Sequence, residues 1–454
     1  MATALAARTL LLIRALGSGK TAIALHLADD VLASESRPAL YVCPAHLLTQ
    51  LEQERQLWGL PRPVRVVDAA SDYQFVPGCL YAISYDRLRQ NRQQIVSTDW
   101  SLVLVDEFHR AKNEDTQNSA VLRSLRKRTE RFVGMTGAPF QNGPKEFFTL
   151  ISLIAGRSLT QRLEDCLAYR REEAGSWFTK WLRRIRGVRP NRGPVVGISD
   201  AATLRATIQQ YVDYLPPQAY CGECGLPEVI RNITEVPLSG EEYAAYKQLQ
   251  AKYRKRKQRA LFDDGLADGE LESACKQMSD LRQILLCHGK EPSSKTQKLC
   301  EDAKAIFETS PEHRCLIFTN FVEAGVGVIA RHLKREGIPH NSFSGNTAGN
   351  DRESIVRAFK NGDVRVVVMS PIGFEGLDLV GTTHVLVADP HYNPETTAQL
   401  VARATRAGGR VKEVLVRHYV SVCDKLKKGT IDEAIVRVAT RKKSVNDMIV
   451  DALA

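Results

Sequence analysis

The sequence predicts a fold of two α/β lobes, separated by a helical segment rich in basic residues. Three observations lead to it: apolar runs alternate with amphipathic stretches near the N-terminus, the alternation returns after about residue 295, and the chain between is rich in charge and helix formers. Apolar runs that alternate with helices indicate a mostly parallel sheet covered on both faces. The chain has 454 residues, which suits two or three domains.

The strands expected in the first lobe, residues 1–155, are short and almost wholly apolar: Thr9–Ile13, Leu40–Cys43, Val64–Val67, Leu80–Ser84, Leu102–Val105 and Phe132–Met135. Between the first two, Ile23, Leu27 and Val31 recur at the spacing of one helix face. In the second lobe, residues 295–454, helices are expected near Glu323–Arg335 and Arg352–Lys360, and strands at Cys315–Phe318, Val364–Met369, Val385–Ala388 and Val414–Tyr419.

Residues 156–294 are expected to form a helical insertion and linker. They carry two clusters of basic residues, at 183–192 and 252–259. The whole chain has 63 Lys and Arg against 52 Asp and Glu, a net charge of +11, which indicates an anionic partner and favours nucleic acid over a membrane surface. The two clusters could track DNA or form solvated helix faces, and their composition leaves both readings open.

The composition excludes several classes of protein. With 43% hydrophobic and 25% charged residues, the chain is globular rather than disordered or collagen-like. Ten cysteines are too few for a disulfide framework and indicate a reduced, intracellular protein. The lone pair Cys221 and Cys224 is a weak signal that does not favour a structural zinc. Neither a signal peptide nor a membrane span is expected, so the protein is predicted not to be secreted.

A segment with the pattern of a phosphate-binding loop follows the first predicted strand and precedes a predicted helix: Gly17, Ser18, Gly19, Lys20 and Thr21. Glycines let backbone N–H groups approach phosphates, Lys20 would neutralise phosphate charge, and Thr21 could bind Mg²⁺. Arg14 stands where the full motif has its first glycine. An ordinary glycine turn before a helix is therefore the alternative.

Two acids, Asp106 and Glu107, directly follow the predicted strand Leu102–Val105. Ligands of open parallel sheets bind at this edge, where one acid could hold Mg²⁺ and the next orient the attacking water. A solvated turn is the alternative. In the second lobe, Gln399, Arg403 and Arg406 share one helix face, which could present cations to a γ-phosphate or could simply be solvated.

Taken in order, these segments resemble the superfamily-two helicase-like ATPases, and within them the Snf-type family of double-stranded DNA translocases. The resemblance covers nearly the whole chain and rests on residues 17–21, 40–44, 83–86, 106–113, 136–142, 281–288, 318–321, 370–379, 389–394 and 399–410. The chain departs from the family pattern at three places: Phe108 replaces a small residue, Tyr392 replaces a tryptophan, and the last motif ends in Gly408-Gly409 where the family usually has Ile or Leu followed by Gly and Gln.

The resemblance implies two RecA-like parallel-sheet lobes that bind ATP and Mg²⁺. Lys20, Thr21 and Asp106 would hold phosphate and metal, and Glu107 would position the hydrolytic water. Gln399 would lie beside the nucleotide, with Arg403 and Arg406 as arginine fingers. Hydrolysis would be coupled to lobe movement by Thr136, Gly137 and Gly376.

The family also has an adenine-binding segment before the phosphate-binding loop, but only 16 residues precede Gly17. Three alternatives follow: the protein has relaxed selectivity for adenine, another segment of the chain recognises adenine, or the sequence begins after the natural start of the protein.

The predicted function is ATP hydrolysis that drives translocation along double-stranded DNA. Two alternatives stand: a strand-separating DNA or RNA helicase or transcription-termination ATPase, and a nucleotide-gated DNA-binding module without turnover. The expected location is the nucleus or another site of DNA replication or transcription, and an accessory-free motor of this kind would also suit a large DNA virus.

Overall fold

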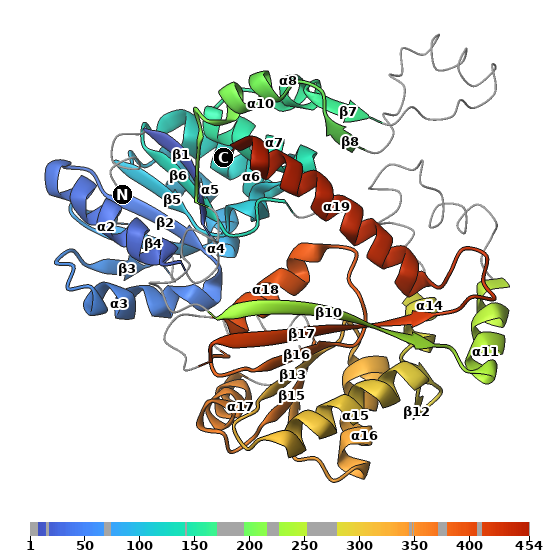
Figure 1. The fold of residues 1–454 in the computed structure, drawn as a ribbon. Helices are drawn as coiled ribbons and strands as arrows, with labels where there is room; N and C mark the ends of the chain where they lie inside the picture. The colour runs from blue at the N-terminus through green and yellow to red at the C-terminus, as the bar shows by residue number, and fades with distance from the viewer. Residues whose placement is uncertain are drawn as a thin grey trace, which may run out of the picture. The chain divides into compact units, whose positions relative to one another are not determined.

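The computed structural model describes residues 8–14, 18–67, 74–140, 143–169, 195–215, 227–251, 279–344, 347, 349–370, 379–405 and 411–453 (Figure 1). The chain divides into two compact units, one made of residues 1–168, 197–220 and 445–454, the other of residues 169–196 and 221–444. Among the helices in the described ranges, none is both long and apolar enough to cross a membrane.

The first unit is built on a parallel sheet with strand order β3-β4-β2-β5-β6-β1-β9. Its strands are β1 (Thr9–Arg14), β2 (Ala39–Cys43), β3 (Val64–Val66), β4 (Leu80–Ser84), β5 (Leu102–Val105), β6 (Phe132–Thr136) and β9 (Val212–Leu215). The six apolar runs expected in this lobe are all strands. The central ones are apolar because both of their faces are covered, and every residue of β2, β4, β5 and β6 is buried, whereas the edge strand β3 is exposed or half-buried. The last strand, β9, pairs with β1 and comes from the interval 156–294.

The helices of this unit connect successive strands. They are α2 (Lys20–Ser34), η1 (Ala45–Leu47), α3 (Leu48–Leu57), α4 (Tyr85–Gln90), α5 (Arg92–Ser97), η3 (Phe108–Ala111), α6 (Gln117–Arg128), α7 (Pro144–Ala155), α8 (Thr160–Glu164) and α10 (Ala201–Ile208). Two short strands, β7 (Leu167–Tyr169) and β8 (Val195–Ile198), pair with each other. On one face of the main sheet, Leu10, Tyr41 and Leu104 pack with Leu27 and Val31 of α2 in a single core.

The second unit contains a parallel sheet with strand order β10-β17-β16-β13-β15-β14. Its strands are β10 (Glu228–Pro237), β13 (Cys315–Phe318), β14 (His340–Phe343), β15 (Val366–Met369), β16 (His384–Val387) and β17 (Glu413–Val422). Figure 1 shows β10, in light green, running alongside β17, in red, although nearly two hundred residues separate them in sequence. Alternate residues of β13 enter different cores, Cys315 and Ile317 on one face and Leu316 and Phe318 on the other.

The remaining elements belong to the second unit, except that the residues of α19 from 445 onward belong to the first. They are α11 (Gly240–Ala251), α14 (Ser279–Ile284), the hairpin strands β11 (Cys287–His288) and β12 (Glu291–Pro292), α15 (Ser294–Thr309), the π-helical turn η5 (Val322–Gly327), α16 (Val328–Arg335), α17 (Gly349–Asn361), α18 (Pro394–Ala404) and α19 (Ile431–Leu453). The two expected helices are confirmed as η5 with α16 and as α17.

Two sets of residues singled out in the sequence lie outside the described residues. They are the basic clusters at 183–192 and 252–259, and the cysteines Cys221 and Cys224. The described part of 156–294 contains the strands β8, β9 and β10 as well as helices. This interval therefore supplies an edge strand to each of the two main sheets.

Candidate active site

The segment between β1 and α2 carries the chain from the edge of the first sheet into a helix. Gly19 caps α2 with a φ of 76°, a left-handed conformation that glycine adopts without strain. The first N–H groups of a helix have no partner within it, so the start of α2 offers donors and positive potential to an anion. Of the predicted phosphate-binding residues, Ser18, Gly19, Lys20 and Thr21 lie here, and Gly17 lies outside the described residues.

Two polar side chains in this segment suit a phosphate ligand. Lys20 is 9% exposed, and its Nζ donates to the backbone oxygen of Arg14 at 3.2 Å. The Oγ of Ser18 is buried and makes no hydrogen bond to any described residue. A buried hydroxyl without a partner is costly unless a ligand or water satisfies it, so these residues fit a bound nucleotide phosphate.

Asp106 lies at the carboxyl end of β5 and is 5% exposed. Its Oδ1 accepts the backbone N–H of Glu107 at 2.8 Å, and its Oδ2 accepts the hydroxyl of Tyr41 at 3.2 Å. Burial and, second, the charge of Glu107 raise the pKa of Asp106 to about 6, although the charge of Lys20 lowers it. Because β1 and β5 run parallel in the same sheet, Asp106 and the start of α2, which carries Lys20, lie at the same edge of that sheet.

Glu107 holds a left-handed backbone conformation with a φ of 49°, which is uncommon for a residue other than glycine. The turn is stabilised by Tyr85, whose hydroxyl donates to the backbone oxygens of Asp106 at 2.6 Å and Glu107 at 3.2 Å. Such strain persists only where surrounding contacts over-determine it, and it is concentrated at functional sites. The turn thus fixes the backbone from which the Glu107 side chain extends, directly after Asp106.

His109 links the acids to the end of the neighbouring strand β6. Its Nδ1 lies 3.2 Å from a carboxylate oxygen of Glu107 and 3.1 Å from the Oγ1 of Thr136. Thr136 is fully buried, and its Oγ1 accepts the backbone N–H of Ala138 at 3.1 Å, across Gly137. A change at Glu107 can therefore reach the segment after β6 through one imidazole ring.

Phe108, one of the departures from the family pattern, is fully buried against β6. A Cβ placed on Gly134 of that strand would lie 2.7 Å from the Phe108 ring, closer than real side chains approach. The large residue after the two acids is therefore accommodated by the absence of a side chain at Gly134.

Sequence reasoning missed one element of this site, the partner of Arg14. The Nη2 of Arg14 donates to the Oδ1 of Asp213 at 2.7 Å, and its Nη1 donates to the Asp213 backbone oxygen at 2.8 Å. Asp213 is in β9, which was not expected as a strand. Arg14 thus anchors the chain immediately before the phosphate-binding segment to an edge strand.

The second unit holds the other predicted site residues. Gln399 and Arg403 are one turn apart on α18, whereas Arg406 and Gly376 lie outside the described residues. The roles of Gln399, Arg403 and Arg406 therefore stay predictions.

Within the second unit, Asp389 joins three segments of the family resemblance, and it is completely buried. Its carboxylate accepts the Thr319 hydroxyl at 2.7 Å, the Asn320 side-chain amide at 2.6 Å and a guanidinium N–H of Arg282 at 3.1 Å. These partners come from two segments, α14 and the residues that directly follow β13, so the carboxylate joins both to its own segment after β16. Nearby, burial lowers the pKa of His391 to about 4, so this ring is neutral at pH 7.

Within the described residues, no three His, Cys, Asp or Glu side chains gather in a way that could hold a metal ion. A protein-only cage is not what Mg²⁺ requires, since Mg²⁺ at nucleotide sites usually keeps one or two protein ligands, substrate phosphates and several waters. The Asp106 carboxylate and the Thr21 hydroxyl supply the hard oxygen atoms that such a site needs.

Comparison with known families gives two matches along the chain. The family described as "SNF2-related domain" matches residues 6–290, and the family described as "Helicase conserved C-terminal domain" matches residues 294–408. The first match alone covers more than half of the chain.

The chain is also similar to individual curated proteins, at low sequence identity. The DNA repair and recombination protein RAD54B of Mus musculus is 25% identical over 457 residues, which cover 91% of this chain and 50% of the relative. The DNA repair and recombination protein RAD54-like of Drosophila ananassae is 23% identical, covering 96% of this chain and 59% of the relative. The chain thus spans about half the length of the curated relatives it matches.

Among solved structures, the Pyrococcus furiosus Hef helicase domain matches with a TM-score of 0.55 and 15% sequence identity, covering 97% of this chain and 96% of that one. At this identity the likeness concerns the fold, and it agrees with two RecA-like parallel-sheet lobes.

Proposed function

The chain belongs to the SNF2 family of superfamily-two helicase-like ATPases, and from this premise we propose that it hydrolyses ATP to ADP and phosphate to drive translocation along double-stranded DNA. The observation that carries the proposal is the grouping of Lys20, Asp106 and Glu107 at one end of the first sheet, with Glu107 joined to Thr136 through His109. A cation, a metal-binding acid and a second acid are the groups that phosphoryl transfer to water needs.

In the proposed reaction, the start of α2 and Lys20 bind the β- and γ-phosphates of ATP. The hydrogen bond from Lys20 to the backbone of Arg14 keeps the ammonium at the loop, so little reorganisation is needed when phosphate replaces that acceptor. Glu107 orients the attacking water and accepts its proton. Bound Mg²⁺, held by Asp106 and Thr21, would neutralise phosphate charge.

We propose that loss of the γ-phosphate is transmitted through Glu107 and His109 to Thr136 and Gly137. From the second unit, Gln399, Arg403 and Arg406 would complete the site when the lobes close, and Gly376 would belong to the coupling segments. The DNA contacts of such a motor are made to the phosphate backbone, since stepping along any sequence requires no base readout.

The first experiment measures steady-state ATP hydrolysis by purified protein with and without duplex DNA. We expect Lys20→Ala and Glu107→Gln to reduce turnover at least a hundredfold while leaving duplex affinity within about threefold, because neither change removes a DNA contact. Hydrolysis that survives Glu107→Gln would refute the assignment of Glu107. The control is Glu130→Gln, which neutralises an exposed acid of the same unit and should leave turnover unchanged.

A comparison of polymers separates the proposed motor from its alternatives. Stimulation of hydrolysis by double-stranded DNA, above that by single-stranded DNA or RNA, supports the translocase. Preferential stimulation by single strands or RNA would support a strand-separating helicase or a transcription-termination ATPase. Absence of turnover with every polymer would leave a nucleotide-gated binding module. As a DNA motor, the protein would act in the nucleus or wherever DNA is replicated or transcribed.

A further inference from the structure

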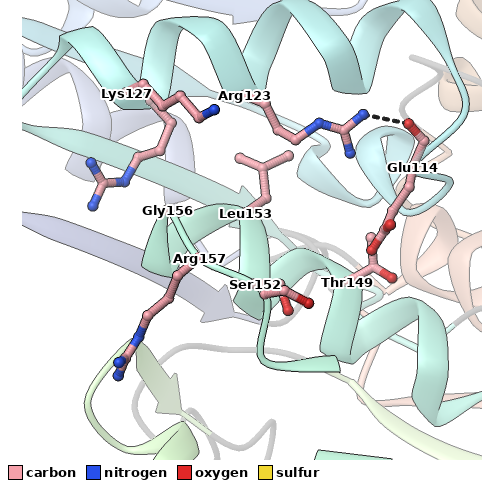
Figure 2. Close-up of a pocket in the computed structure, with 10 residues that line it drawn as sticks. Glu114, Arg123, Lys127, Thr149, Ser152, Leu153, Gly156 and Arg157 are labelled. Atoms are coloured by element: carbon pink, nitrogen blue, oxygen red, sulfur yellow. Dashed lines mark hydrogen bonds between the residues drawn. The ribbon is translucent and has the colours of Figure 1, made fainter. Parts of the chain in front are cut away.

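A pocket of about 240 Å³ lies between α6 and α7 of the first unit, and cationic side chains surround it (Figure 2). Its lining residues are Glu114, Arg123, Arg126, Lys127, Thr149, Ser152, Leu153, Gly156, Arg157 and Ser158. Four of them are cations and one, Glu114, is a carboxylate, so the pocket as the structure describes it is strongly positive. Figure 2 shows Arg123 and Lys127 on one side of the pocket and Arg157 on the other.

Main-chain contacts hold two of these cations in place. The Nε of Arg126 donates to the backbone oxygen of Ile154 at 2.7 Å, and the Nη2 of Arg123 donates to that of Glu114 at 2.5 Å. Neither contact neutralises the guanidinium charge. Arg157 reaches the hydroxyl of Tyr211 at 3.4 Å, again a neutral partner. Anchored guanidinium groups that have no carboxylate partner among the described residues are pre-organised for an anionic ligand.

A second hollow continues the positive surface around the end of α6. It is lined by Gln90, Arg92, Gln93, Val96, Ser97 and Arg128. Arg92, Lys127 and Arg128 are exposed and form no ion pair with another described residue. We call the cations of the two hollows the α6 basic surface: Arg92, Arg123, Arg126, Lys127, Arg128 and Arg157.

The direction of α6 places three cations of this surface, those in its last turn, away from the candidate active site. The strands of the sheet are parallel, so Asp106 and Glu107, which follow β5, lie at the edge where the strands end. α6 leads from that edge to the start of β6, and its last turn is therefore at the opposite edge. Arg126, Lys127 and Arg128 occupy that last turn.

Cations in the last turn of a helix also interact favourably with the helix dipole, by about 0.3–1 kcal/mol each. That effect would explain Arg126, Lys127 and Arg128, but it does not explain Arg92 on α5 or Arg157 beyond α7. Cations from three elements that gather over two adjacent hollows match a ligand with repeated negative charges. A single small anion would fill one hollow only.

We propose that the α6 basic surface binds the phosphate backbone of double-stranded DNA, at a place separate from the active-site edge of the first lobe. The choice of DNA as the polymer rests on the proposed function. Arginine and lysine at the rim, with the hydroxyls of Ser97 and Ser158, contact phosphates without reading bases. A contact at this place would hold a duplex segment while the active site turns over.

The test is a fluorescence-anisotropy titration of a labelled duplex, without nucleotide, at 50 and 200 mM salt. The variant is Lys127→Gln/Arg128→Gln, and the control with the same loss of charge is Arg65→Gln/Lys334→Gln, which removes exposed cations elsewhere. The salt slope is the slope of the logarithm of the DNA affinity against the logarithm of the salt concentration, and removing two phosphate contacts lowers its magnitude by about 1.8. The wild type should therefore lose its affinity advantage over the variant by about tenfold when the salt rises from 50 to 200 mM. The control should retain the wild-type slope.

Other outcomes overturn the inference. An unchanged salt slope in the variant, or an equal loss in variant and control, would show that the surface does not bind DNA. If the variant lost binding to polyglutamate but kept DNA binding, the surface would be assigned to an acidic protein partner. If the variant lost only the binding of inorganic triphosphate, the surface would be assigned to a small anion.

Acetylation of wild-type protein gives an independent measurement that does not depend on a variant's folding. Duplex should protect Lys127 relative to Lys334, and equal labelling of both would refute the proposal. Failure of DNA to stimulate ATP hydrolysis would contradict the proposed function while leaving these binding results intact.

Discussion

The contact between Phe108 and Gly134 gives a stability prediction whose size follows from the structure. A Cβ at Gly134 would lie 2.7 Å from the Phe108 ring, whereas ordinary carbon contacts are about 3.5–4.0 Å, so about 1 Å of movement is needed. The ring is fully buried on the neighbouring η3 turn and cannot swing outward. We therefore expect Gly134→Ala to destabilise the protein by about 2–3 kcal/mol, near the top of the range for overpacking.

Gly134→Ala should stabilise rather than destabilise the protein when the Phe108 ring is absent. Phe108→Ala alone should cost about 3–5 kcal/mol through the cavity that it leaves. In that background the alanine methyl at position 134 fills part of the cavity and recovers about 0.8 kcal/mol. The double-mutant cycle should therefore show a coupling energy of about 3 kcal/mol between the two positions.

Urea unfolding, monitored by tryptophan fluorescence, measures these four free energies. The matched control is Gly197→Ala in the same unit, because a Cβ there meets only the Ala168 Cβ at 4.0 Å. We expect this control to change stability by less than about 0.5 kcal/mol. An equal cost of Gly134→Ala in the two backgrounds would refute the reasoning, since the steric origin of the effect would then be excluded.

Two further predictions concern charged groups. Burial raises the pKa of Asp106 to about 6, so the native state binds more protons than the unfolded state between about pH 4 and 6 and loses stability as pH rises through this range. In magnesium-free buffer, Asp106→Asn should raise the free energy of unfolding, measured by thermal unfolding, by up to about 3 kcal/mol at pH 8 and by much less at pH 3.5. An equal increase at the two pH values would contradict the raised pKa of Asp106. Arg14→Ala should destabilise by about 2–3 kcal/mol because it leaves the Asp213 carboxylate largely buried without its cation. The charge swap Arg14→Asp/Asp213→Arg should recover part of the lost free energy of unfolding, measured in urea. A swapped protein no more stable than Arg14→Ala would argue against a stabilising ion pair.

The central strands and the local motifs were predictable from the sequence. Strands such as Leu102–Val105 are buried on both faces, so they consist of uninterrupted apolar residues and are easy to locate. Their order along the chain, with glycines after β1 and acids after β5, predicts which residues reach one edge of the sheet. The start of α2 and the two acids follow from this pattern alone.

Only the tertiary structure revealed the edge strands β9 and β10, whereas the edge strand β3 was predictable from its valines. β10 consists mostly of exposed and half-buried residues, with one buried residue, Val236, and β9 is half-buried throughout. An edge strand has fewer neighbours to cover it, so its sequence can lack the apolar run that identifies a central strand.

The long-range partners within each unit also required the fold. Arg14 and Asp213 are 199 residues apart, and Arg282 and Asp389 are 107 residues apart. No local pattern in the chain couples such positions, because their contact depends on the order in which strands join the sheet. The sequence therefore determined which chemical groups the candidate active site contains, and the parallel arrangement of the strands decided which groups hold them in place.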